Sequence, residues 1–211
     1  MIVFGANGFA KQLLPTLVDL KTEVVFLDQD RSNSTLYKYP IIHKVEDVDA
    51  FFQKDNQFTL GVGNPRLRKK LSEILENRGG RLAGLQNKHS MVSDIETYLD
   101  ESVQFLQSTI VESFVQIGKG TLLNIGAKVC HDSKVGAFCE IGPNVTIAGG
   151  CTIGNGCSFG ASATVIPNIR IGNNVTIGAG AVVINDIPDN CVVVGVPGKI
   201  IKEVALSSQF Q

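Results

Sequence analysis

Tryptophan is absent from this 211-residue chain, and aromatic residues of all kinds make up only 7% of it. A core without many large rings must be filled by aliphatic side chains, and the 22 glycines indicate that turns are frequent. A strong charge of either sign is also missing, since the formal net charge is −1. No strong field therefore favours nucleic acid or an anionic membrane surface as a partner.

Long apolar runs are lacking too. Stretches such as Val192 to Val196 are far too short to span a bilayer. The N-terminus, Met1-Ile-Val-Phe-Gly, has no basic region and no cleavage pattern, so we do not expect a signal peptide. Five cysteines without a C-x-x-C pair do not favour a disulfide framework. We therefore expect a soluble, cytoplasmic protein.

Residues 1–85 alternate between strand-like and helix-like patterns. Expected strands at 1–4, 23–27 and 58–62 are each followed by a turn, and helices are expected at 9–20, 45–52 and 66–77. This order predicts a Rossmann-like α/β domain with a parallel sheet and a binding site at the carboxyl ends of its strands. The turn Gly5-x-x-Gly8 leads into a helix whose free N–H groups suit a phosphate. Because it is not G-x-G-x-x-G, a dinucleotide cofactor is disfavoured.

From Val111 the sequence follows a period of six. Thirteen consecutive hexads begin with a large apolar residue, and their fifth residues are mostly small or β-branched. The first residues are Val111, Ile117, Leu123, Val129, Val135, Ile141, Ile147, Ile153, Phe159, Val165, Ile171, Ile177 and Val183. Such a repeat predicts a three-sided parallel β-helix in which three hexads make one coil. We expect it to occupy residues 86–211, with an irregular first coil in 90–110 and a C-terminal cap after Pro188.

His131 is the outward-facing residue that stands out among the hexads. The inward positions of its hexad are taken by Val129 and Ser133, so the imidazole is expected on the solenoid surface. With an ordinary pKa of about 6.5, an exposed imidazole can accept a proton near neutral pH. A plain surface histidine is the alternative interpretation.

The cysteines are interpreted as structural. Cys139, Cys151 and Cys157 occupy fifth positions and are expected to be small core residues. Cys139 and Cys157 are one coil apart and should stack, which would permit a disulfide that a cytoplasmic location argues against. His43 and His89 are expected to be structural or solvent-facing. No cluster with ligand spacing is present, so no catalytic metal is predicted.

Nearly the full length of the chain resembles a known family. The matching segments are Ile2-Val-Phe-Gly-Ala-Asn-Gly, Phe26-Leu-Asp, Gly61-Val-Gly-Asn-Pro-Arg-Leu-Arg-Lys, Leu123-Asn-Ile-Gly-Ala-Lys-Val-Cys-His-Asp, Ala148-Gly149 and Val194-Gly-Val-Pro-Gly-Lys. They are similar to those of the left-handed hexapeptide-repeat acyltransferases, and of the sialic-acid O-acetyltransferase and nucleotide-amino-sugar N-acetyltransferase branch (NeuD/PglD type). The left hand of the β-helix, a homotrimer and active sites between subunits are implied by this resemblance.

The resemblance also implies roles for individual residues. His131 would be the general base and Asp132 would orient it, although adjacent residues on a strand face opposite ways. Acetyl-CoA would contact Gly149, Ala161, Gly178, Ala179 and Lys199. The nucleotide-linked substrate would contact Gly5, Asn7, Gly8, Asp28, Gly63, Asn64, Arg68 and Glu140, the last of which stands where related sequences often carry a second histidine.

The function implied is N-acetylation of a nucleotide-linked amino sugar, such as a 4-amino-4,6-dideoxyhexose, for surface glycan synthesis. O-acetylation of a sialic acid is the second enzymatic hypothesis, and an acyl donor larger than acetyl stays open. A nucleotide-binding regulator or a structural solenoid is the non-enzymatic alternative. A purely structural solenoid would show a repetitive outer face, whereas here the outward positions are irregular and include the His131–Asp132 pair.

Overall fold

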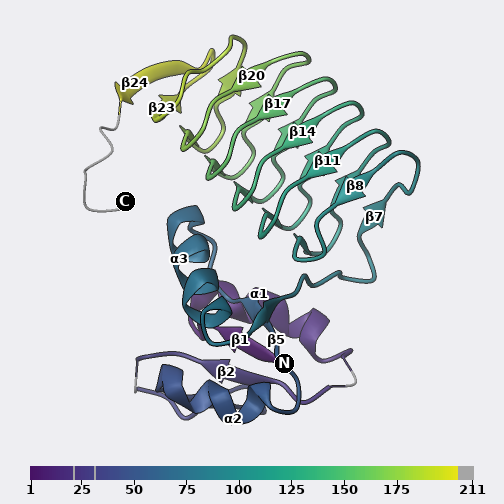
Figure 1. The fold of residues 1–211 in the computed structure, drawn as a ribbon. Coiled ribbons are helices and arrows are strands. Elements are labelled where there is room, and N and C mark those ends of the chain that lie inside the picture. Colours follow the sequence, from purple (N-terminus) through teal and green to yellow (C-terminus); the bar gives the residue numbers. More distant parts are fainter. Residues whose placement is uncertain (21, 31, 204–211) are drawn as a thin grey trace.

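A computed structural model describes residues 1–20, 22–30 and 32–203 of the chain. An N-terminal α/β part carries a solenoid whose coils stack away from it (Figure 1). The last eight residues of the expected β-helix segment, 204–211, lie outside the described residues.

The α/β part is built on one six-stranded sheet. Its strands lie in the order β3-β4-β2-β1-β5-β6 and are parallel except for the β3–β4 hairpin. The strands are β1 (Ile2–Phe4), β2 (Val25–Leu27), β3 (Thr35–Leu36), β4 (Tyr39–Ile42), β5 (Gln57–Leu60) and β6 (Arg81–Leu82). The helices are α1 (Gly8–Leu17), α2 (Val48–Phe52), which follows a 3₁₀ turn at Val45–Asp47, and α3 (Pro65–Glu76).

The predicted strands and helices are present with shifted ends, but the β3–β4 hairpin and β6 were not predicted. Pro40 lies inside β4, and proline argues against a strand because it cannot donate to a ladder. Pro40 is tolerated because the parallel pairing of β4 with β2 involves only Ile41, opposite Phe26, and Ile42, opposite Leu27. Tyr37 at φ +56° makes the tight turn between β3 and β4. A hairpin this short leaves little periodic signal in the sequence.

The central strand β1 marks a switch in the winding of the sheet. β2 lies on one side of β1, and β5 lies on the other. The residues of β1, β2 and most of β5 are buried and apolar, as expected for strands covered on both faces. Ligands of such sheets bind where the carboxyl ends of the two diverging strands leave a crevice. In this chain that crevice lies between the turn after β1 and the loop after β5.

The solenoid consists of three parallel sheets, one for each side. The β13 sheet has the order β22-β19-β16-β13-β10-β7, the β14 sheet β20-β17-β14-β11-β8, and the β15 sheet β24-β23-β21-β18-β15-β12-β9. Two-residue strands alternate with turns throughout: β7 (Met91–Val92), β8 (Tyr98–Leu99), β9 (Gln104–Phe105), β10 (Ile110–Val111), β11 (Gln116–Ile117), β12 (Leu122–Leu123), β13 (Lys128–Val129), β14 (Lys134–Val135), β15 (Glu140–Ile141), β16 (Thr146–Ile147), β17 (Thr152–Ile153), β18 (Ser158–Phe159), β19 (Thr164–Val165), β20 (Arg170–Ile171), β21 (Thr176–Ile177) and β22 (Val182–Val183).

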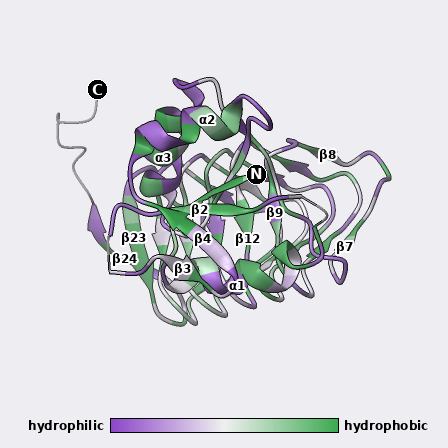
Figure 2. Cartoon of the chain, turned by 90° about the horizontal axis from the view of Figure 1, so that it is seen from below, coloured by the Kyte–Doolittle hydropathy of each residue, from purple (hydrophilic) through white to green (hydrophobic). Residues whose placement is uncertain are grey.

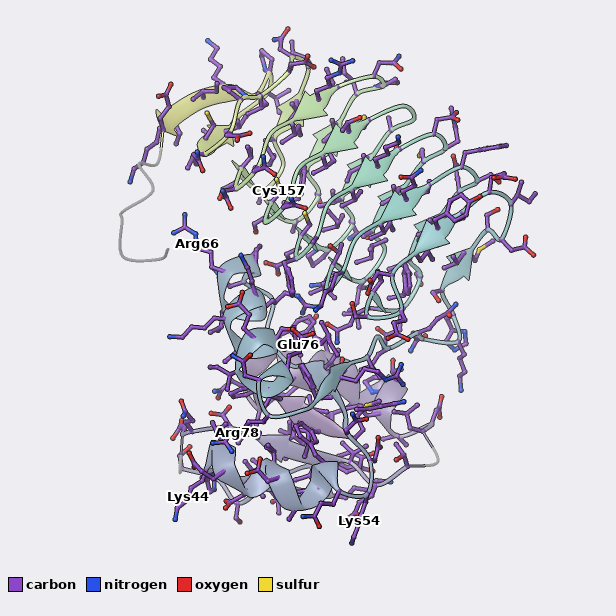
Figure 3. The ribbon with its side chains drawn as sticks, in the orientation of Figure 1. Lys44, Lys54, Arg66, Glu76, Arg78 and Cys157 are labelled. Carbon is purple, nitrogen blue, oxygen red and sulfur yellow. The ribbon has the colours of Figure 1, made fainter. Side chains whose placement is uncertain are left out.

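The hexad pattern is confirmed position by position. All thirteen first residues and all thirteen fifth residues are buried in one continuous core. The fifth positions include Cys139, Cys151 and Cys157, which are buried free thiols as predicted, and Figure 3 labels Cys157 among the coils. Burial of two residues in every six leaves four outward or turn positions per hexad open to other roles.

Both ends of the solenoid depart from the period. In the first coil Met91 pairs with Ile110, a spacing of 19 residues, whereas Lys128 pairs with Thr146, a spacing of 18. At the other end β23 (Cys191–Val194) joins the β15 sheet, and β24 (Lys199–Glu203) folds back antiparallel on it. The expected irregular first coil and C-terminal cap are thus both present. The first contact of the chain with the solenoid ladder is at Gln86, which forms an isolated parallel bridge with Phe105.

The α/β part packs on the β15 sheet of the solenoid. Leu106 and Leu122 share a buried cluster with Val3 and α1, and Phe138 packs against the cluster on the other side of the parallel sheet. Seen from below in Figure 2, the α/β part lies in front of the side of the solenoid that carries β9 and β12. Lys119 forms an ion pair with Glu76, which Figure 3 labels at the end of α3.

The charged centre of this contact is Arg68 on α3. Its side chain is fully buried and donates to three acceptors: Gly120 O at 2.9 Å, Val62 O at 2.7 Å and Gln104 Oε1 at 2.5 Å. Arg68 was predicted to contact substrate; in this structure its side chain is buried, and Nε and both terminal nitrogens each donate to an acceptor within the chain. It joins the loop after β5 to two coils of the solenoid.

Within the described residues, no helix combines the length and the apolar character that crossing a membrane requires.

Opposite faces of one short strand allow a direct test of the solenoid interior. Ile153 on β17 is 3% exposed, whereas its neighbour Thr152 points outward. We expect Ile153→Ala to lower the free energy of unfolding by about 2–5 kcal/mol, because it leaves a cavity in a packed core. Thr152→Ala should change it by less than about 0.5 kcal/mol. Urea unfolding at fixed protein concentration measures both, and equal effects would contradict the inward assignment.

Candidate active site

The turn after β1 begins the nucleotide side of the candidate site. Gly5 has φ +104°, and a Cβ there would lie 2.8 Å from Val62 Cγ1, so only glycine fits between the two loops. Gly8, the first residue of α1, faces open space, with no atom within 4 Å of a Cβ built on it. A ligand could therefore approach the start of α1 closely.

Asp28 and Asn7, both predicted to contact substrate, are bound to each other. Asp28 Oδ2 accepts from the backbone N of Ala6 at 2.7 Å and from Asn7 Nδ2 at 3.2 Å. Asn7 is the N-cap residue of α1 but makes no side-chain cap, because its amide is directed to Asp28. The carboxylate thus holds the turn in shape, and the N–H groups of the first turn of α1 keep their capacity to bind an anion.

The opposite wall of the crevice is the loop after β5. Asn64 caps α3 by accepting from Leu67 N at 3.1 Å, and Pro65 follows it at the first helical position. Gly63 faces Glu140 of the solenoid, since a Cβ on Gly63 would lie 3.0 Å from Glu140 Cδ. The structure therefore brings Gly63 and Glu140 together, while the side chain of Asn64 serves as a helix cap.

Glu140 and Arg68 influence each other's charge across this junction. Burial raises the pKa of Glu140, whereas the positive charge of Arg68 and a hydrogen bond from Ser158 lower it. Burial lowers the pKa of Arg68 to about 9, and the negative charge of Glu140 opposes this shift. Each group thus keeps the other ionised in a region that would otherwise favour the neutral forms.

His131 lies in the turn that joins β13 to β14, on the edge between those two sheets. Its side chain is 63% exposed, and Nδ1 is 2.8 Å from Asp132 Oδ2. Asp132 has φ +59°, a left-handed turn conformation, which is why two adjacent side chains reach the same side. Since a carboxylate can only accept at Nδ1, that nitrogen carries the proton in the neutral imidazole, and Nε2 then has a free lone pair.

Gly149 covers the imidazole from the next coil. A Cβ at this position would lie 2.6 Å from His131 Cε1 and 2.7 Å from Nε2, so any larger residue would displace the ring. The coils are joined here by a hydrogen bond from Gly150 N to His131 O at 2.9 Å. Among the described residues no acceptor pairs with the N–H of Gly149.

Glu112 is a neighbour of His131 that the sequence did not reveal. Its Oε2 accepts from the backbone N of His131 at 2.9 Å. Together with His131 it lines a groove of about 700 Å³ along the first coils, whose other lining residues are Ser90, Met91, Val92, Ser93, Ile110, Val111 and Ser113. The coil period could have revealed this contact. Residues 18 positions apart stack in neighbouring coils, so Glu112 lies directly below Cys130, the residue before His131.

The carboxylates around His131 favour its protonated form. The hydrogen bond to Asp132 raises the pKa of His131, and the charges of Asp132 and Glu112 act in the same direction. The raised pKa means that His131 holds a proton to higher pH than an isolated imidazole and is a stronger base once it loses that proton.

The residues predicted to bind acetyl-CoA fall into two groups. Gly149 lies beside His131, whereas Ala161, Gly178 and Ala179 lie in the turns between β18 and β19 and between β21 and β22. The two turns of the second group are joined by a hydrogen bond from Gly180 N to Ala161 O. Lys199 lies near them, because its strand partner Val194 packs against Gly178. Within one chain these turns form the edge between the β15 and β13 sheets, away from the edge that carries His131.

No group of three or more His, Cys, Asp or Glu residues suited to a metal ion is present in the ranges 1–20, 22–30 and 32–203. The five cysteines are free thiols, of which only Cys130 is partly exposed.

Comparison with known proteins agrees with this architecture. Residues 1–75 match the family described as PglD N-terminal domain, and residues 114–149 and 150–185 match bacterial transferase hexapeptide (six repeats). The fold and these matches define the chain as a hexapeptide-repeat acyltransferase.

Similar solved structures cover almost the whole chain. A histidine-to-asparagine variant of perosamine N-acetyltransferase from Caulobacter crescentus, in complex with CoA and GDP-perosamine, is 29% identical, with a TM-score of 0.89 over 95% of this chain and 96% of that one. The acetyltransferase domain of PglB from Neisseria gonorrhoeae, in complex with acetyl coenzyme A, is also 29% identical, with a TM-score of 0.85 over 95% and 98%. WeeI from Acinetobacter baumannii is 28% identical, with a TM-score of 0.86 over the same shares. The chain belongs to the NeuD/PglD-type sugar acetyltransferases, as its sequence predicted.

The contribution of Asp132 to the charge of His131 can be measured directly. We expect Asp132→Asn to lower the pKa of His131, so that the imidazole loses its proton at a lower pH than in the unmodified protein. An NMR titration of the imidazole Hε1 resonance gives the midpoint. Asp189→Asn, which removes a carboxylate bound to Asn173, is the control and should leave the midpoint unchanged. An unchanged midpoint in Asp132→Asn would show that the contact does not persist in solution.

Proposed function

We propose that this protein transfers an acetyl group from acetyl-CoA to the amino group of a nucleotide-linked amino sugar, such as a 4-amino-4,6-dideoxyhexose, for surface glycan synthesis. The observation that carries the proposal is the presence in one chain of a phosphate-type crevice at Gly5–Gly8 and an exposed His131–Asp132 pair under Gly149. The similar enzyme in complex with CoA and GDP-perosamine supports the same pairing of donor and acceptor.

The proposed reaction needs no covalent enzyme intermediate. A sugar amine is largely protonated near neutral pH, and Nε2 of His131 removes one proton so that the nitrogen lone pair can attack the thioester carbonyl. The N–H of Gly149 donates to the oxyanion that forms there. The C–N bond is then complete, the C–S bond breaks with its electron pair on sulfur, and the nitrogen gives its second proton to the leaving CoA thiolate as the amide forms. The imidazolium returns the first proton to solvent, so the products are the N-acetyl sugar, free CoA and one proton.

The base is tested by release of free CoA thiol from acetyl-CoA with UDP-, dTDP- and GDP-linked amino sugars and free sialic acid as acceptors. We expect turnover with one nucleotide-linked amino sugar and a loss of at least about a hundredfold in kcat for His131→Ala. His89→Ala, which removes another exposed histidine, is the matched control and should retain the rate.

Other outcomes of this assay point elsewhere. Turnover with free sialic acid alone would indicate O-acetylation. Nucleotide binding without turnover would indicate a regulator. Equal rates for His131→Ala and the unmodified enzyme would remove His131 from the mechanism.

The proposed assembly is a homotrimer whose active sites lie between subunits. His131 lies on the edge between the β13 and β14 sheets, and the α/β part packs on the third, β15 sheet, so the two halves of the site face away from each other in one chain. A second copy is the simplest source of the missing half, since closed symmetric oligomers place different edges of neighbouring copies side by side. The same arrangement would bring Ala161, Gly178, Ala179 and Lys199 near a neighbour's Gly149.

Mixed oligomers test this arrangement. Gly8→Glu would place a negative charge in open space at the start of α1, where it repels a diphosphate without disturbing the helix. We expect Gly8→Glu and His131→Ala to be inactive alone. After unfolding and refolding together in equal amounts they should recover about a quarter of the normal activity, because a quarter of the shared sites combine two intact halves. Recovery that does not exceed the single variants would contradict a shared site.

We place the reaction in the cytoplasm, where acetyl-CoA is available and thiols stay reduced. The five free cysteines support this location, and stacked Cys139 and Cys157 in particular are buried without forming a disulfide.

A further inference from the structure

Glu112 is the side chain near His131 to which the proposed mechanism gives no task. It follows β10 in the coil below the histidine, and its carboxylate reaches upward to the backbone N of His131 at 2.9 Å. That contact uses Oε2. Among the described residues no donor pairs with Oε1, and the side chain is exposed to the groove.

Among the described residues, no lysine or arginine lines the groove around Glu112. Its polar lining consists of serines and His131, and its apolar lining comes from residues such as Met91 and Val92. The charged groups that act on His131 are Asp132 and Glu112, both negative. The nearest lysine on the adjacent strand, Lys128, donates to Gly126 O. When His131 is neutral and ready to act as a base, a positively charged ligand group would therefore meet a carboxylate that no lysine or arginine of the groove lining neutralises.

A nucleotide-linked amino sugar carries such a group, because its amine is an ammonium ion before the reaction. We propose that Glu112 forms the anionic subsite that receives this ammonium and holds it beside Nε2 of His131. The inference rests on the proposed function and deepens it, since it names the charge that distinguishes an amine acceptor from a hydroxyl acceptor. In the chemical step the ammonium gives one proton to Nε2, so the positive charge moves from nitrogen to imidazole while both stay near Glu112. The carboxylate itself neither gains nor loses a proton.

A glutamine at this position separates charge from structure. Glu112→Gln keeps an oxygen that can accept from His131 N but removes the negative charge, whereas Glu112→Ala removes both. If Glu112 binds the ammonium, both variants should raise KM for the amino sugar about tenfold, as expected for a lost charge-assisted hydrogen bond. kcat should change less than KM.

A neutral analogue completes the test. The same nucleotide sugar with a hydroxyl in place of the amine should inhibit the unmodified enzyme and Glu112→Gln with the same inhibition constant. Glu101→Gln, which removes an exposed carboxylate paired with Arg81, is the control and should leave KM unchanged.

Two results would overturn the inference. Normal KM in Glu112→Gln would show that the residue only supports the backbone of His131. An equal weakening of the amine and hydroxyl ligands would show general damage to the groove. Failure of the proposed function is distinguishable, because the unmodified enzyme would then turn over no amino sugar before any variant is made.

Discussion

The parallel ladder that joins residues 18 positions apart in the regular coils of the solenoid governs the rest of this structure. Val129 pairs with Ile147, for example, and the same offset stacks Gly149 over His131. Because the backbone bonds fix this offset, neighbouring coils cannot slip without breaking many hydrogen bonds at once. The position of the imidazole is thus set by the interior packing of the coils, and its orientation is set by Asp132 and by the missing side chain at Gly149. A reactive group on an exposed turn gains the precision of a rigid scaffold in this way.

The contact between the two parts of the chain depends on a different kind of interaction. A buried guanidinium without acceptors would be strongly destabilising, but Arg68 has three acceptors and the opposite charge of Glu140 nearby. Two of its bonds reach into the solenoid and one holds Val62 O, in the loop that forms a wall of the nucleotide crevice. The residue that fixes the relative position of the two parts therefore also fixes the shape of that crevice.

The sequence predicted the solenoid well, because the inward positions repeat at a fixed spacing and an apolar or small residue at each of them indicates burial there. It also predicted the pairing of His131 with Asp132, although a strand would have separated them; the positive φ of Asp132 is not visible in a single sequence. The role of Arg68 could not be predicted, since exposed and buried arginines on an amphipathic helix look alike until the partner surface is known. Glu112 was not predicted because it lies 19 positions before His131 in the sequence. The two residues become neighbours only when the coils stack.

In the solenoid, the residues that stabilise the fold and the residues available for chemistry occupy different positions of each hexad. The interior uses two positions in each hexad, so an outward residue such as Glu112 can change without a cavity or a lost core contact. The residues that bind acceptor and donor can therefore vary while the coil stays the same, and related enzymes can differ in substrate without differing in fold. The turns at the edges are the natural place for such variation, because left-handed conformations there project adjacent side chains together. His131 lies on one edge of the solenoid and the Gly5–Gly8 turn belongs to the part that packs on the third side, so in the proposed trimer the chemistry would depend on assembly.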